Sequence, residues 1–212
     1  LSILALLFLC CYASATETQR VMIGDFSSGN LDGWQEKGFS GETQYQLLTL
    51  NSNTALRSKS QNSASGLYKK IRVDLSKYPY LNWRWRIENR LETQNEQIKS
   101  GDDYAVRIYV IVSGGLLIWR AKALNYVWAN ASPKYNVWPN AFAGKKAMMM
   151  ALRSKQDETS TWYVEKRNVF EDLKTIFGTD IQHIDAVAIM TDTDNNGGQA
   201  TSYFGDIFFT SQ

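Results

Sequence analysis

The sequence predicts an all-β fold, a two-sheet antiparallel jelly-roll-like sandwich with one short helix. Short runs of β-branched and aromatic residues recur along the chain, separated by Gly, Asn and Asp. One segment alone combines helix start and stop signals, and no linker rich in Pro or Ser divides the chain. A closed barrel is the alternative arrangement of the same strands.

The expected strands lie between these separating residues and show alternation of apolar and polar residues. In 81–88, for example, Leu81, Trp83 and Trp85 share one face, opposite Arg84 and Arg86. The expected strands are 21–26, 44–50, 54–59, 66–74, 80–88, 103–113, 116–127, 146–153, 161–168, 185–191 and 203–210. The expected helix is Val169–Phe177, with Asn168 as its N-cap, acidic residues in its first turns and Gly178 as its end.

Residues 1–15 are expected to be a secretory signal peptide and residues 16–212 a single β-sandwich domain. The apolar run before Ala13 is too short for a membrane span, which needs about 20 residues. Ala13-Ser14-Ala15 fits a small-x-small cleavage site. We therefore expect an exported protein, periplasmic or secreted, with no membrane span in its mature part. Both cysteines lie inside residues 1–15, so disulfides and thiolate chemistry are not expected in the mature chain.

Charge and composition exclude several classes of function. With 23 Lys+Arg, 21 Asp+Glu and no basic cluster, the chain gives no support for a nucleic-acid partner. His183 is the sole histidine and no G-x-S-x-G segment is present, which argues against a serine hydrolase triad and a zinc site. Glycine-rich nucleotide-binding motifs are absent from the sequence as well.

An Arg/Tyr face is the first candidate site. Alternation in 81–88, 103–113 and 161–168 places arginines with Tyr or Glu on the side opposite the apolar residues. If the three strands are neighbours in one sheet, they form a surface that matches an acidic sugar chain, because guanidinium groups bind carboxylates and tyrosines stack on sugar rings. The alternative is a solvated face with charges paired across strands. The residues are Arg84, Arg86, Arg107, Tyr109, Tyr163, Glu165 and Arg167.

The aromatic-rich stretch from Trp119 to Trp138 is the second candidate. Its rings lie beside loop-forming Asn, Ser and Pro, so Trp128 and Trp138 are expected to line the rim of a glycan site. The alternative is that these rings close the edge of the sandwich.

Two pairs of carboxylates are candidates for a structural calcium ion. Asp192 and Asp194 begin a D-x-D-x-N-G segment, but Tyr203 occupies the position where an EF-hand has its bidentate Glu. Asp25 and Asp206 occupy similar places in the first and last strands, which commonly lie side by side in sandwiches. The alternative is that all four carboxylates belong to ordinary turns.

Several ordered motifs resemble one bacterial family. DFSSGNLDGW (25–34), LNWRWRIEN (81–89), GDDYAVRIYVIV (101–112), FGTDIQHIDAVAIMTDTDNNG (177–197) and YFGDIFF (203–209) are similar to the family called domain of unknown function 3047. The resemblance implies an exported protein and assigns no catalytic residue. The opening and closing motifs also resemble jelly-roll, galactose-binding-like carbohydrate-binding modules, in which a structural calcium near the terminal strands would favour Asp25 and Asp206.

We therefore expect a non-enzymatic exported β-sandwich that binds a glycan or another cell-envelope ligand. One alternative is a polysaccharide lyase acting on a uronate, in which Arg107 neutralises the substrate carboxylate and Tyr109 or Tyr163 removes the proton. Another alternative is a structural or assembly protein of the envelope.

Overall fold

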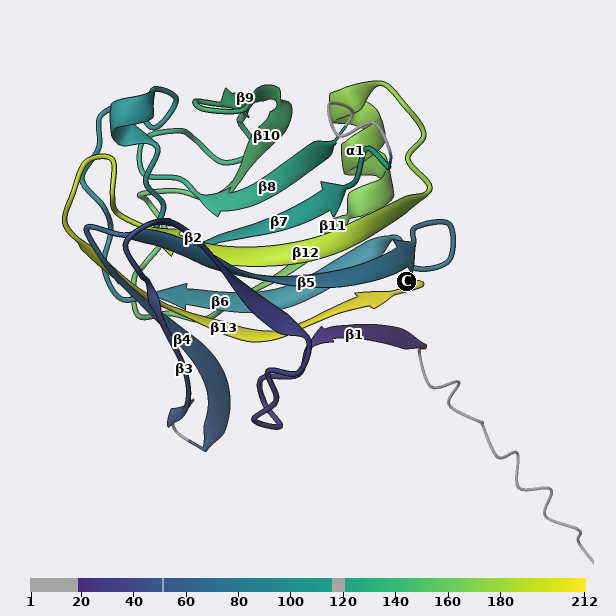
Figure 1. The fold of residues 1–212 in the computed structure, drawn as a ribbon, viewed down its shortest axis with the longest axis horizontal. Coiled ribbons are helices and arrows are strands. Elements are labelled where there is room, and N and C mark those ends of the chain that lie inside the picture. The colour runs from purple at the N-terminus through teal and green to yellow at the C-terminus, as the bar shows by residue number, and fades with distance from the viewer. Residues whose placement is uncertain (1–18, 51, 116–120) are drawn as a thin grey trace, which may run out of the picture.

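The computed structural model describes residues 19–50, 52–115 and 121–212, and within them two β-sheets pack face to face (Figure 1). The predicted sandwich is therefore confirmed, as is the single α-helix of the described residues, α1 (Val169–Phe177). Asn168 caps this helix by accepting a hydrogen bond from the Glu171 amide, and Gly178 ends it in the left-handed conformation.

One sheet has six strands. Its order is β11-β6-β13-β4-β3, with β1 paired to β13. The strands are β1 (Arg20–Gly24), β3 (Gln44–Leu50), β4 (Asn53–Gln61), β6 (Tyr80–Ile87), β11 (Tyr163–Asn168) and β13 (Gln199–Thr210). All pairs are antiparallel, and the first and last strands lie side by side as expected.

The other sheet has seven strands in the order β2-β5-β12-β7-β8-β10-β9. The strands are β2 (Trp34–Ser40), β5 (Ala64–Asp74), β7 (Arg107–Val112), β8 (Lys122–Trp128), β9 (Val137–Asn140), β10 (Gly144–Arg153) and β12 (His183–Asp192). The β8–β10 pair is parallel and the others are antiparallel. A short 3₁₀ turn, Lys99–Gly101, precedes β7.

Several strand predictions differ from the structure, and β13, for example, begins at Gln199 and not at Tyr203. The edge strands β2 and β9 were not predicted, because β2 is almost wholly exposed and polar and β9 has four residues including Pro139. The predicted strand 103–113 begins only at Arg107. The first part of the predicted strand 116–127 lies outside the described residues, as does the predicted signal peptide 1–15.

The main core lies between the two sheets and is rich in large rings. Trp83 meets Trp85 edge to face at 5.4 Å between ring centroids and Tyr126 at the same distance. Phe204 and Phe209 of β13 are fully buried in the same cluster. Within the described part of the chain, no helix is long and apolar enough to cross a membrane.

Candidate functional site

The predicted Arg/Tyr face does not form as one surface, because its three strands belong to different sheets. Strands β6 and β11 are neighbours in the six-stranded sheet, whereas β7 lies in the seven-stranded sheet. Arg107 and Tyr109 are therefore separated from the other predicted residues by the core of the sandwich.

Arg84 and Arg86 point outward from the six-stranded sheet, as alternation predicted, but both guanidinium groups are engaged. Arg84 lies over the Trp162 ring at 4.8 Å, and Gly205 gives it room, since a Cβ there would lie 2.4 Å from the Arg84 Cγ. Arg86 lies over Tyr203 and donates from Nε to Glu88 Oε1 at 2.8 Å. These arginines cap the aromatic rings of their own face.

The outward placement predicted for Tyr163, Glu165 and Arg167 is wrong. In register they pair with Trp85, Trp83 and Leu81, the core-facing residues of β6, while Val164 is 75% exposed. Glu165 accepts hydrogen bonds from Trp85 Nε1 and Arg153 Nε, and Arg167 pairs with Asp172 of α1. Strand β11 is an edge strand, and inward-pointing charges on an edge disfavour pairing with another chain. The expectation that the apolar residues of a strand face the core is therefore wrong for β11.

The rim prediction for Trp128 and Trp138 is also wrong, because both side chains are buried. Trp128 is 1% exposed in the core between the sheets, and its Nε1 donates to the Ser154 carbonyl. Trp138 is buried in a second cluster with Tyr104, Val127 and Met149. Neither ring offers a surface to a ligand, in agreement with the alternative that they close the sandwich.

A row of three residues crosses the outward face of the seven-stranded sheet. Tyr68 of β5 pairs with Ala188 of β12, which pairs with Tyr109 of β7. Since neighbouring strands lie about 4.8 Å apart, the two tyrosines flank the small Ala188 side chain at a separation of about 10 Å. The Tyr68 hydroxyl donates to Gln35 Oε1 at 2.7 Å, which holds its ring in place.

This row forms the middle of an apolar groove of about 180 Å³. Phe39, which is 68% exposed, stands at one side, and Gly66 and Met190 extend the floor. No cation or aromatic ring of the described residues stacks on Tyr68 or Phe39. The volume is smaller than the roughly 300–1,000 Å³ of pockets that enclose a ligand, so the groove fits one face of a ligand. Its lining residues are Lys37, Phe39, Gly66, Leu67, Tyr68, Tyr109, Ile111, Ala188, Ile189 and Met190.

Arg107 lies beside Tyr109 on the same face and is held by a buried ion pair. Its Nη2 donates to Asp192 Oδ2 at 2.7 Å, and its guanidinium lies over the rings of Tyr104 and Tyr109. Burial raises the pKa of the Tyr109 phenol above its ordinary value, against the opposing charge of Arg107. A lyase would need Tyr109 to act as a base, but its phenol keeps its proton. It would also need Arg107 to bind the substrate carboxylate, but Arg107 is already paired with Asp192. Neither residue therefore favours the lyase chemistry.

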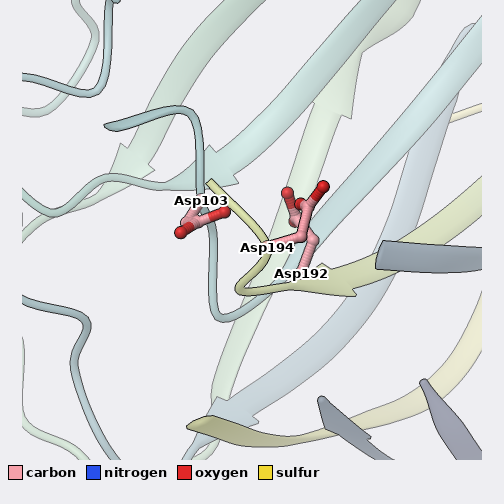
Figure 2. A group of neighbouring side chains, drawn as sticks. All are labelled: Asp103, Asp192 and Asp194. Carbon is pink, nitrogen blue, oxygen red and sulfur yellow. The ribbon is translucent and has the colours of Figure 1, made fainter. Parts of the chain in front are cut away.

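Three carboxylates that could hold a metal ion meet where β12 ends (Figure 2). One oxygen from each of Asp103, Asp192 and Asp194 lies within 4.8 Å of the others. Asp25 and Asp206 belong to no such group among the described residues. Instead, both Asp206 oxygens accept hydrogen bonds from Ser27, one from its amide and one from its hydroxyl.

Sequence reasoning missed Phe39, Tyr68 and Asp103. Alternation in the predicted strand 66–74 could have placed Tyr68 outward, since Leu67 and Val73 are apolar partners on the other side. No local signal links Asp103 to Asp192, because the two residues meet only through the pairing of β7 with β12.

Solved structures of several carbohydrate-active proteins are similar in fold. A family 30 carbohydrate-binding module of a Clostridium thermocellum cellulase matches at 14% identity and a TM-score of 0.50, covering 85% of this chain and 92% of that one. A family 11 module from the same organism matches at 11% identity and a TM-score of 0.49, covering 92% and 98%. A variant of the Cel12A cellulase of Rhodothermus marinus matches at 9% and 0.49, covering 91% and 100%. At 14% identity the likeness to the family 30 module shows the fold alone.

No curated protein matches the chain. The model of one family, described as protein of unknown function (DUF3047), matches residues 32–208. That match spans most of the chain, including the seven-stranded sheet, the groove and the six-stranded sheet apart from β1 and the end of β13. The chain therefore belongs to the DUF3047 family.

Proposed function

We propose that this protein is a non-catalytic glycan-binding module and that its ligand lies in the groove on the seven-stranded sheet. The observation that carries the proposal is the row Tyr68–Ala188–Tyr109, in which a small residue leaves a gap between two rings. Sugar rings have an apolar face that stacks on aromatic side chains, with hydroxyls at the edges for hydrogen bonding. The jelly-roll fold shared with carbohydrate-binding modules supports the same function.

The groove favours a neutral glycan over an acidic one. Lys37 is the one charged side chain among its described lining residues, and the nearby Arg107 is neutralised by Asp192. The acidic ligand expected from the sequence required several arginines at the site, and Arg84 and Arg86 lie on the opposite sheet. A β-linked glucan, whose sugar rings present flat faces in succession, suits an open groove of this shape.

Calorimetric titration with neutral gluco-oligosaccharides, and with oligogalacturonate as the acidic comparison, tests the proposal. We expect saturable binding of a neutral ligand and loss of that binding in Ala188→Leu, which fills the gap between the tyrosines. Val164→Leu, at an exposed position of the other sheet, is the matched control. Absence of binding at millimolar ligand, or binding that Ala188→Leu leaves unchanged, would contradict the proposed site.

We propose in addition that the protein acts outside the cytoplasm. The apolar run and the Ala13-Ser14-Ala15 motif of the sequence support export. N-terminal sequencing of protein recovered from the periplasm or medium should begin after Ala15. Retention of the uncleaved chain in the cytoplasm would be inconsistent with this location.

A further inference from the structure

The carboxylates at the end of β12 come from two segments that are distant in sequence. Asp192 is the last residue of β12, Asp194 follows in the loop, and Asp103 precedes β7 (Figure 2). Asp103 holds the loop through hydrogen bonds, because its two oxygens accept from the amides of Asn195 and Asn196. Backbone hydrogen bonds therefore fix the Asp103 carboxylate against the loop that carries Asp194, and Arg107 fixes the Asp192 carboxylate.

Negative charge at this place exceeds the positive charge available to balance it. Asp102 lies next to the group, and Arg107 is the cation that pairs with it, through Asp192. The carboxylates of Asp102, Asp103, Asp192 and Asp194 therefore repel one another, with the charge of Arg107 as the compensation. An additional cation would relieve this repulsion.

A second observation points independently to a ligand. Asp192 is 1% exposed, and while its Oδ2 accepts from Arg107, its buried Oδ1 has no hydrogen-bond partner among the described residues. A buried carboxylate oxygen without a donor is costly, and native structures rarely leave one unsatisfied. The same side chain contributes an oxygen to the three-carboxylate group, so a cation bound there would give the Asp192 carboxylate a partner besides Arg107.

We propose that Asp103, Asp192 and Asp194 bind a calcium ion. The donors are all carboxylate oxygens, which hard cations prefer, and the group contains no His or Cys that would favour zinc. Calcium also tolerates the irregular geometry of a loop and completes its coordination with water, whereas magnesium demands a near-ideal octahedron. The ion would link the loop after β12 to the segment before β7, next to the Arg107–Asp192 pair.

Titration of the EDTA-stripped chain with calcium chloride, followed by calorimetry, tests this proposal without any glycan. We expect a dissociation constant on the order of 10⁻⁴–10⁻³ M, as in extracellular modules with few carboxylate ligands. At a calcium concentration of about 100 times that constant, the unfolding temperature should rise by roughly 5–10 °C. Magnesium at the same concentration should give a much smaller rise.

Two single variants locate the ion. Asp194 is exposed, so Asp194→Asn should fold normally and weaken calcium binding by roughly tenfold or more. Asp206→Asn is the matched control, because Asp206 lies outside the group and was the alternative ligand suggested by the sequence. No calcium binding at 10 mM, about tenfold above the weakest affinity expected, would overturn the proposal. So would equal affinity for magnesium, or binding that depends on Asp206 and not on Asp194.

Discussion

The two outward faces of the sandwich carry the same residue types but differ in how many of their rings are covered. On the six-stranded sheet, Arg84 and Arg86 lie over Trp162 and Tyr203, so cations cover the rings. On the seven-stranded sheet, Arg107 lies over Tyr109, but no described cation or ring stacks on Tyr68, and a groove lies next to it. Arginines and aromatic residues on a strand therefore do not by themselves indicate a binding face. What distinguishes the faces, among the described residues, is that the seven-stranded sheet leaves the rings of Tyr68 and Phe39 uncovered beside a groove.

The arginines of the two faces also differ in burial, and this gives the largest expected effect. Arg107 is 6% exposed and pairs with a buried carboxylate, so Arg107→Gln leaves Asp192 without its counter-ion and should cost about 3–5 kcal/mol of unfolding free energy. Arg84→Gln removes a half-buried cation–π contact and should cost about 1 kcal/mol or less. Urea unfolding of both variants measures the difference. Equal losses would mean that the Arg107 pair is no more important than a surface contact.

The second prediction concerns ligand binding by the rings themselves. Tyr68→Ala removes one wall of the groove and should weaken glycan binding by about 2 kcal/mol, or roughly 30-fold, as expected for an aromatic anchor. Trp162→Ala, the matched change on the other face, should leave affinity within about twofold, because that ring is capped by Arg84. Calorimetry with the same oligosaccharide compares the two. A larger loss of affinity in Trp162→Ala than in Tyr68→Ala would indicate that the ligand binds on the six-stranded sheet instead.

The sequence was sufficient to predict the sandwich, the helix and most strands, because these depend on local signals. Val169–Phe177 has a capping Asn168 before it and Gly178 after it, and both act as the sequence indicates. Strand β6 alternates strictly, so its two faces could be assigned without knowing its neighbours.

The candidate site could not be predicted to the same extent, because it depends on which strands become neighbours. Arg107 and Arg84 have similar local patterns but lie in different sheets. Tyr163 and Glu165 lie in the edge strand β11, where charged residues can face inward and an apolar residue such as Val164 can be exposed. Strand order and edge position arise from long-range pairing, on which alternation within one strand carries no information.

A smaller, pH-dependent effect is expected on the six-stranded face. Burial acts to raise the pKa of Glu88, but hydrogen bonds from Arg86 and Ser160 outweigh it and hold the pKa below its ordinary value of 4.5. The stability that this carboxylate contributes is present above that ordinary value and is lost as the pH falls through the lower native one. Glu88→Gln should therefore lower the unfolding free energy by up to about 1 kcal/mol at pH 7 and have little effect near pH 2. Urea unfolding across this range measures it, and a difference that persists undiminished at low pH would show that the charge is not responsible.

On the seven-stranded face, the pH dependence of stability is expected in alkali and not in acid. Of the four predictions, this one has the smallest effect on stability at neutral pH. Burial raises the pKa of Tyr109 above its ordinary value of 10.0, although Arg107 opposes the shift. The unfolded chain therefore loses this proton first, and stability falls as the pH rises from about 10 through the raised native value. Tyr109→Phe removes this titration and a weak hydrogen bond to the Met190 sulfur, so stability at pH 7 should change by less than about 1 kcal/mol. Between pH 10 and 11 the variant should lose less stability than the wild type in urea unfolding. An identical decline in both proteins would mean that the Tyr109 phenol ionises as readily in the folded protein as in the unfolded chain. The two faces would then differ in the stacking of their rings alone.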